Sequence, residues 1–261
     1  MDNVTFVFEA DFNFDETYET DLTGYMNSVG QGFRISRQFD GHGQYQTSVV
    51  TIGLDNNGGH FHPGNMASPL YGLLNPDVPV RLRAEHAEVS YTLWTGYVRE
   101  WGTPSGDIGR QRCDVFCHDL AGLLRESEAL SLTVEERTTG EALLAVAAAL
   151  GLDSGDYVFD AGVQTLPIHY ARQQDARDAA NQVVMSEMGG RDFINADGQW
   201  VFEDRNHRLG LDVAHTWGDG TQIRPRTVTP RTSSEERISN VKVQASIYTE
   251  GQADHPPRAA S

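Results

Sequence analysis

Short strand-like segments separated by turn signals dominate the first half of the sequence. Each is rich in β-branched and aromatic residues, as strands are. One of them, Val80–Ala84, alternates apolar and polar side chains with the period of two of a half-buried strand. The clearest segments are 4–8, 47–54, 80–84, 89–98 and 113–116. They predict a β-barrel or sandwich over residues 1–125.

The character of the sequence changes in the middle, over residues 126–205. Thr138 and Glu141 have the spacing of a capping box before an alanine- and leucine-rich helix, and Gly151 supplies its C-terminal stop. A second helix is predicted over about 175–188, where apolar residues recur at spacings of three and four. Together with the hairpin that follows, these helices predict a small α/β domain.

The remaining segments complete the predicted organisation. Asp197-Gly198 lies between Phe193-Ile194 and Trp200-Val201-Phe202 and is typical of a two-residue hairpin turn. Residues 206–250 return to a β pattern, most clearly over 237–245, and residues 251–261 are expected to form a disordered tail. The expected fold is therefore α+β and mainly β, with β-barrel-type domains and an inserted small α/β domain.

The chain is strongly acidic, with a formal charge of −17 from 37 acidic and 20 basic residues, of which only Lys242 is a lysine. Such a surface lacks the cations that replace counterions on nucleic acid, so we expect no specific nucleic-acid binding. A GC-rich genome or a saline habitat would explain the arginine bias and the acid excess equally well. The longest apolar run, Ala142–Leu150, is far shorter than the roughly 20 residues of a membrane span. Met1–Asn3 does not begin like a signal peptide.

Asp11, Asn13 and Asp15 occupy alternate positions, as the first ligands of an EF-hand calcium loop do. The glycine and the glutamate that such a loop needs further on are replaced by Glu16 and Leu22. A solvated turn between strands is therefore the expected state of this segment, and a calcium site is the alternative.

Cys113 and Cys117 lie on one predicted strand, four residues and so roughly 13 Å apart, whereas a disulfide needs less than about 7 Å. We therefore expect free thiols. With His118 they could begin a metal site, but a structural zinc site needs four ligands, and no second pair is evident. His60 and His62 lie in a loop rich in glycine and asparagine, without a nearby carboxylate pair. No metal and no cofactor are predicted.

No arrangement typical of catalysis stands out. The sequence has no G-x-S-x-G motif and no phosphate-binding glycine loop, and Cys117 and His118 would face opposite sides of a strand. With 37 acidic residues, carboxylate pairs of the kind that glycosidases use are inevitable and carry no information. We expect a protein that is not an enzyme and has no catalytic residues.

The order of these segments resembles the N-terminal part of phage minor tail proteins. In that family a strand ends in a Leu-Asp-Asn turn with Gly and Phe, followed by Pro-Gly-Asn, a Tyr-Gly-x-Leu-x-Pro-x-x-Pro-Val-Arg segment and then Phe/Trp-Thr-Gly-Tyr. The matching residues here are Leu54, Asp55, Asn56, Gly59, Phe61, Pro63, Gly64, Asn65, Tyr71, Gly72, Leu74, Pro76, Pro79, Val80, Arg81, Trp94, Thr95, Gly96 and Tyr97. The middle region is similar to the α/β domain of baseplate hub proteins, and residues 237–244 to the strand that re-enters their barrel. The resemblance covers about residues 4–250.

This resemblance implies a structural component of a virion: a baseplate or tail-tip hub subunit at the distal end of the tail. Such hubs form rings, commonly homotrimers, in which two barrel-like domains per subunit mimic the six-fold symmetry of the tube. The implied partners are further copies of the chain, distal tail or tail tube proteins, the tape measure protein, and tip or fibre proteins. DNA would pass through the lumen without specific binding. Many members of the family continue beyond the re-entry strand with further domains.

Two other functions stay open at this stage. A carbohydrate- or receptor-binding module of the tail tip would need exposed aromatic residues round an apolar groove, and Trp94, Trp101, Trp200 and Trp217 could serve there or in the core. A cell-wall hydrolase of the tail tip is the other alternative. For a hub, we expect the acidic excess on the inner wall of the ring, where it repels DNA, and the arginines at subunit contacts.

Overall fold

The computed structural model describes residues 4–26, 32–39, 44–103, 111–127 and 130–209. They belong to one compact unit, residues 1–211, and the second unit, 212–261, lies outside the described residues. The predicted return to β over 206–250 therefore lies outside them except for its first four residues, and so does the predicted tail. No helix in the described part has the length and apolarity to cross a membrane.

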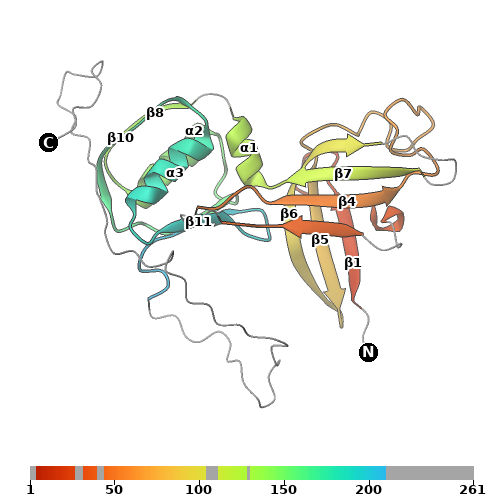
Figure 1. Ribbon diagram of the computed structural model, residues 1–261, viewed down its shortest axis with the longest axis horizontal. Coiled ribbons are helices and arrows are strands. Elements are labelled where there is room, and N and C mark those ends of the chain that lie inside the picture. The colour runs from red at the N-terminus through yellow and green to blue at the C-terminus, as the bar shows by residue number, and fades with distance from the viewer. Residues whose placement is uncertain (1–3, 27–31, 40–43, 104–110, 128–129, 210–261) are drawn as a thin grey trace, which may run out of the picture. The chain divides into compact units, whose positions relative to one another are not determined.

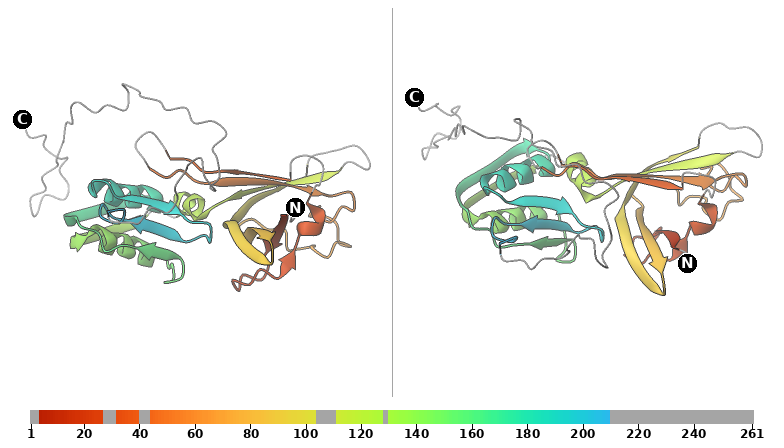
Figure 2. Two further views of the ribbon diagram at one scale, coloured as in Figure 1. Left: turned by 90° about the horizontal axis from the view of Figure 1, so that it is seen from below. Right: turned by 60° about the horizontal axis from the view of Figure 1, so that its bottom comes forward.

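Seven antiparallel strands form a single sheet in the order β2-β1-β5-β6-β7-β4-β3. The strands are β1 (Thr5–Ala10), β2 (Thr20–Asp21), β3 (Phe33–Ser36), β4 (Val49–Asp55), β5 (Pro79–His86), β6 (Val89–Gly102) and β7 (Arg112–His118), with a short 3-10 helix (Thr23–Tyr25) after β2. Side chains alternate between the faces, and one face buries a core that includes Phe8, Ile52 and Trp94. Figures 1 and 2 show the β5–β6 hairpin turning steeply away from β4 and β7, so the sheet is strongly twisted. The strands predicted for this part are confirmed.

The sheet curls back on itself but does not close in the described residues. Phe6 on β1 and Phe33 on β3, near opposite ends of the strand order, have ring centroids 4.9 Å apart. No hydrogen-bonded ladder joins these two strands there. In place of the predicted barrel there is an open, curled sheet, because β2 pairs with only two residues of β1 and β3 ends the order on the other side.

Helices and short strands make up the second part of the described chain. They are α1 (Leu120–Glu126), β8 (Leu130–Thr138), α2 (Thr139–Ala149), β9 (Tyr157–Phe159), β10 (Thr165–Gln174), α3 (Ala176–Ser186), β11 (Arg191–Ile194) and β12 (Trp200–Glu203). β8 and β10 form an antiparallel ribbon, and β9 joins the β11–β12 hairpin as a parallel third strand. Figure 1 shows α2 and α3 side by side, with the β8–β10 ribbon running round them. Their alanine and valine side chains share a second core with Trp200 and Phe202.

Local sequence signals begin and end the two longer helices. Thr138 accepts a hydrogen bond from the Glu141 amide, and the Glu141 carboxylate accepts one from the Thr138 amide, so the predicted capping box is confirmed. Gly151 follows α2 with a φ of +73°, the left-handed conformation that commonly ends helices. Asp175 caps α3, which ends at Ser186, two residues earlier than predicted.

The turn between β11 and β12 differs from the predicted two-residue form. The Asn195 amide donates to the Gln199 carbonyl at 3.0 Å, which leaves a loop of three residues between this pair. Gly198 is the last of the three and has a φ of +87°, as the glycine of a three-residue hairpin loop does. The Asp-Gly signal thus located the hairpin but not its loop length, because the glycine serves as the third loop residue instead of the second.

A buried ion pair joins α3 to the β11–β12 hairpin. Arg177 has no exposed surface, and its guanidinium pairs with the carboxylate of Asp192. Asp192 also accepts a 2.8 Å hydrogen bond from the Trp200 indole, while Arg177 donates to the Tyr45 carbonyl at 3.1 Å. These partners compensate the desolvation of both charges, which would otherwise be strongly destabilising.

Tyr45 extends this network into the sheet. Its hydroxyl donates to Asp119 at 2.6 Å, and Asp119 also accepts the Ser48 amide at 3.0 Å. Ser48 in turn accepts a hydrogen bond from the Trp94 indole at 3.0 Å. A continuous relay of buried hydrogen bonds therefore connects the core that contains Trp94 with the core that contains Trp200.

Glu187, just after α3, is a second buried charge of this part. Its carboxylate accepts hydrogen bonds from the Thr139 hydroxyl and the Gln164 amide, both at 2.8 Å, and from Arg205 at 2.6 Å. Burial raises the pKa of Glu187, but these donors outweigh burial and hold the pKa at about 2. The segment before β10 is thereby tied to the start of α2 and the end of α3.

Asp192→Asn is expected to lower the free energy of unfolding by about 3–5 kcal/mol, because it leaves the Arg177 charge buried without its counterion. Urea unfolding followed by tryptophan fluorescence measures the change. The double variant Arg177→Met/Asp192→Leu removes both charges and should lose clearly less stability. A larger loss in the double variant would contradict the assigned cause.

The folded-state pKa of Glu187 lies below the usual 4.5, so its charged form stabilises the fold above that pH. This contribution should be lost as the pH falls from about 4.5 toward 2, because folded Glu187 takes up a proton over that range. In Glu187→Gln the melting temperature should be lower at neutral pH and should fall less steeply in acid than in the wild type. Circular dichroism melting curves at several pH values check this, and parallel profiles for the two proteins would rule it out.

Candidate functional site

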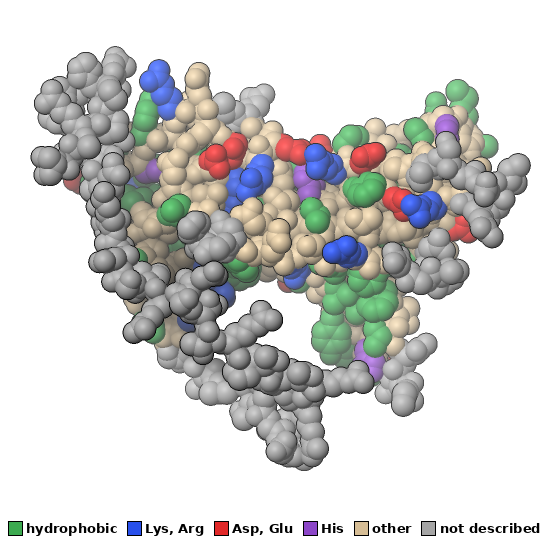
Figure 3. All heavy atoms as spheres, viewed as in Figure 1, with side chains coloured by type: hydrophobic (Ala, Val, Ile, Leu, Met, Phe, Trp, Pro, Cys, Tyr) green, Lys and Arg blue, Asp and Glu red, His purple; other side chains and the backbone are tan. Residues whose placement is uncertain are grey.

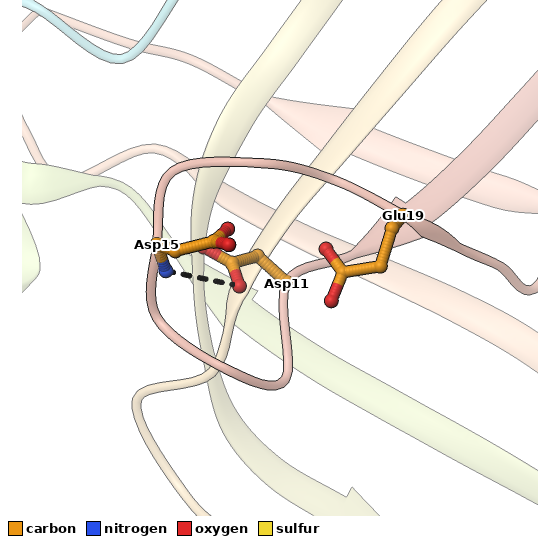
Figure 4. Close-up of side chains that lie close together, drawn as sticks. All are labelled: Asp11, Asp15 and Glu19. Atoms are coloured by element: carbon orange, nitrogen blue, oxygen red, sulfur yellow. Dashed lines mark hydrogen bonds between the residues drawn. The ribbon is translucent and has the colours of Figure 1, made fainter.

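The loop between β1 and β2 is organised by one buried carboxylate. Asp11 has no exposed surface, and its oxygens accept hydrogen bonds from the amides of four loop residues at 2.8–3.4 Å. Figure 4 shows this carboxylate between those of Asp15 and Glu19. Asn13 and Asp15 remain exposed. The expected solvated turn therefore describes the outer residues of the loop but not Asp11, which holds the loop together.

Asp11, Asp15 and Glu19 bring carboxylate oxygens within 4.8 Å of one another. The third member of the cluster is Glu19 and not Asn13, which the calcium pattern would require. The side-chain amide of Asn13 instead donates a hydrogen bond to Asp15 at 3.1 Å. Both oxygens of Asp11 already accept backbone hydrogen bonds, and three carboxylates fall short of the six to eight oxygen ligands that calcium takes. The cluster is better suited to framing the loop than to holding a cation.

A cavity of about 480 Å³ adjoins this loop and is strongly acidic. Its carboxylates are Asp11, Glu16, Asp153, Asp156 and Asp197. Among the described residues of its wall there is no arginine, histidine, cysteine or serine. Burial raises the pKa of Tyr18 in the wall to about 12, so this phenol stays neutral. Such a cavity can hold a cationic group and repels phosphate.

The cysteines and histidines singled out in the sequence form no cluster of possible metal ligands in the described residues, although Cys117 and His118 both line the second cavity described below. Cys113 and Cys117 are free and buried, and burial raises the pKa of both thiols, that of Cys113 to about 12. Neither is therefore a thiolate near neutral pH. His118 follows Cys117 on β7, and burial lowers its pKa. His60 and His62 lie in the β4–β5 loop and join no cluster of possible metal ligands in the described residues.

The tryptophans form no sugar-binding surface in the described part of the chain. Trp94 and Trp200 are buried in the two cores. Trp101 is partly buried and stacks with Phe12 and Phe61, each at 6.1 Å between ring centroids. Trp217 lies outside the described residues.

A second cavity, of about 380 Å³, lies against β4, β6 and β7 beside α1, and we name it the β7 groove. Its main lining residues are Val49, Arg99, Phe116, His118, Arg125 and Glu126. Sequence reasoning missed this site. The sequence did carry a signal for it: at Val98-Arg99-Glu100-Trp101 the alternation of buried and exposed side chains along β6 is interrupted. A β-bulge inserts one extra residue there.

Comparison with known proteins finds similarity among solved structures. No family model and no curated protein matches the sequence. A tail protein from Neisseria meningitidis aligns with 84% of this chain at 14% identity, with a TM-score of 0.49. A 43 kDa prophage tail protein from Shewanella oneidensis aligns with 77% at 10% identity, with a TM-score of 0.47.

An Escherichia coli component of the type VI secretion system, itself similar to bacteriophage tail proteins, aligns with 78% of the chain at 10% identity and a TM-score of 0.41. The chain spans 57%, 56% and 46% of these three proteins, about half of their length. The solved structures found in this comparison therefore include tail proteins, the kind of protein that the sequence resembles. Since the TM-scores are below 0.5, we rest no assignment of function on these structures.

Removal of divalent cations with EDTA should leave the melting temperature unchanged, because backbone donors hold Asp11 and the carboxylate cluster lacks a complete ligand set. Thermal unfolding with EDTA and with added calcium checks this. Asp11→Asn, which weakens the contacts to the loop amides, is the positive control for a less stable loop. A drop of several degrees in EDTA would instead indicate a cation held by Asp11, Asp15 and Glu19.

Proposed function

We propose that the chain is a non-enzymatic structural subunit of a phage-type tail: a baseplate or tail-tip hub that forms a ring of identical copies, by its resemblance a homotrimer. The ring closes the distal end of the tail tube and connects it to tip or fibre proteins. The observation that carries this proposal is the curled seven-stranded sheet, whose edge strands lack a ladder partner on one side in the described residues. Open edges pair readily with further strands or with neighbouring subunits.

Residues 206–250 can supply one such strand. The segment 237–244 resembles the strand with which hub proteins return to their barrel. Phe6 and Phe33 bring the two sides of the sheet together, so a single added strand is near both. We therefore propose a β-barrel-type hub domain made of residues 1–125 and 206–250, with 126–205 as the inserted α/β domain and 251–261 as a tail.

The other two tail-tip functions have less support. A hydrolase needs an acid, base or nucleophile placed in a cavity. Both cysteines are buried with raised pKa values, which disfavours a thiol nucleophile. The acidic cavity does offer carboxylates, the groups that glycosidases use, so a zymogram on cell-wall material is the direct test of this alternative. A carbohydrate-binding module needs exposed aromatic rings gathered round an apolar groove. Trp94 and Trp200 lie in the cores, and exposed rings such as Tyr91 and Tyr170 lie on different strands, β6 and β10.

The charge of the chain suits a channel for DNA. Many arginines neutralise buried or half-buried carboxylates within the chain: Arg81 and Arg83 both bind Glu9, and Arg205 binds Glu187. The remaining acid excess is available for exposed faces. We propose that it lines the bore, where it leaves the duplex mobile because no phosphate is neutralised. The tail tube and tape measure proteins are the further partners of such a hub, which is made in the host cytoplasm and joins the virion.

Cryo-electron microscopy of the assembled tail should show the chain as a closed ring of three copies whose bore has more Asp and Glu than Arg. Mass photometry of the purified chain gives the number of copies independently. Isolated monomers on the outside of the tail would overturn the structural role. A ring with a neutral or arginine-rich bore would overturn the charge argument alone.

A further inference from the structure

The β7 groove combines apolar walls with a basic rim. Val49 and Phe116 are 47% and 41% exposed and lie on adjacent, paired strands. The same groove is lined by two arginines, Arg99 and Arg125, and by a single carboxylate, that of Glu126. In Figure 3 the face over β4 and β7 shows apolar, basic and histidine side chains close together, with carboxylates nearby. A site with more arginines than carboxylates is thus set in a chain of net charge −17.

The backbone places the polar groups of this groove. Arg99 is the extra residue of the β6 bulge, and bulges re-aim side chains. Arg125 lies in the last turn of α1, and neither arginine forms an ion pair within the described residues. Gly122 lets the His118 ring lie against α1, since a Cβ at that position would meet it. His118 is 4% exposed, and its Nε2 atom has no hydrogen-bond partner in the described part.

The loop over residues 11–19, which we name the Phe14 loop, has features complementary to this groove. Phe14 is 57% exposed and has a φ of +58°, a rare conformation for a bulky residue, which the hydrogen bond from its amide to Asp11 supports. Glu16 and Glu19 are exposed on the same loop and form no ion pair in the described residues. Strained conformations of this kind cluster where a loop binds or switches.

We propose that the Phe14 loop of one copy docks into the β7 groove of the next, with Phe14 against Val49 and Phe116 and the loop carboxylates on the two arginines. This inference rests on the proposed ring. Loop and groove are different surfaces of one chain, so the contact is head-to-tail, the kind that closes into a ring. Acidic copies repel one another over most of their surfaces, and the local basic groove sets the position at which they meet.

Arg125→Glu should weaken self-association about tenfold or more, because it places like charges in the contact. Arg172→Glu is the matched control: Arg172 on β10 is equally an exposed arginine without an ion pair in the described residues, and its loss should leave assembly unchanged. Adding Glu16→Arg/Glu19→Arg to Arg99→Glu/Arg125→Glu should restore the ring by exchanging the charges. Sedimentation velocity measures assembly, and circular dichroism melting curves show that each variant is folded.

Photo-crosslinking identifies the occupant of the groove. A benzoylphenylalanine placed at position 116, in a mixture of isotope-labelled and unlabelled full-length chains, should link to the peptide 11–21 of a different copy. Links to residues 212–261, or links confined to one copy, would overturn the proposal. Rings that persist in Arg99→Glu/Arg125→Glu would overturn this inference and leave the proposed function standing, whereas a wild type that forms no ring would overturn both.

Discussion

The buried pair of Arg177 and Asp192 is the interaction on which the rest of the described structure depends. Hydrophobic packing is not directional, but a buried charge is stable only when a counterion and hydrogen-bond partners are placed close to it. The partners of this pair come from α3, from the β11–β12 hairpin and from Tyr45, which precedes β4. Through Tyr45 the relay continues to Trp94 in the sheet core. The two cores alone would permit several relative placements of these segments, and the relay selects one.

The same requirement divides the carboxylates of this acidic chain into two groups. Asp11, Glu9 and Glu187 are buried, and each is surrounded by backbone amides or arginines that order a neighbouring segment. The exposed carboxylates are hydrated and supply most of the net charge. In the acidic cluster beside β1, Asp11 belongs to the first group, whereas Asp15 and Glu19 are exposed. The buried Asp11 holds the loop that contains Phe14 in a strained conformation.

The proposed assembly depends on the few surfaces of this acidic chain that can attract another copy: the open edges of the sheet and the β7 groove. A ring of strongly acidic copies needs contacts whose attraction exceeds the general repulsion. The open sheet edges offer backbone hydrogen bonds, and the β7 groove offers unpaired arginines beside apolar side chains. Both are surfaces on which a further strand or a further copy of the chain can dock.

Signals that lie close together in the chain were predictable from the sequence: the capping box of Thr138, the hairpin at Asp197-Gly198 and the alternating strands all depend on a few neighbouring residues. The predictions failed where distant segments meet, as in the burial of Asp11 and the groove beside Arg99, and the predicted barrel is not closed within the described residues. The sequence by itself determined the order of the elements, the free thiols and the acidity, because spacing and composition set them. Only the tertiary structure decided which charges are buried and which strands end the sheet, since contacts between residues far apart in the chain leave no periodic trace in the local sequence.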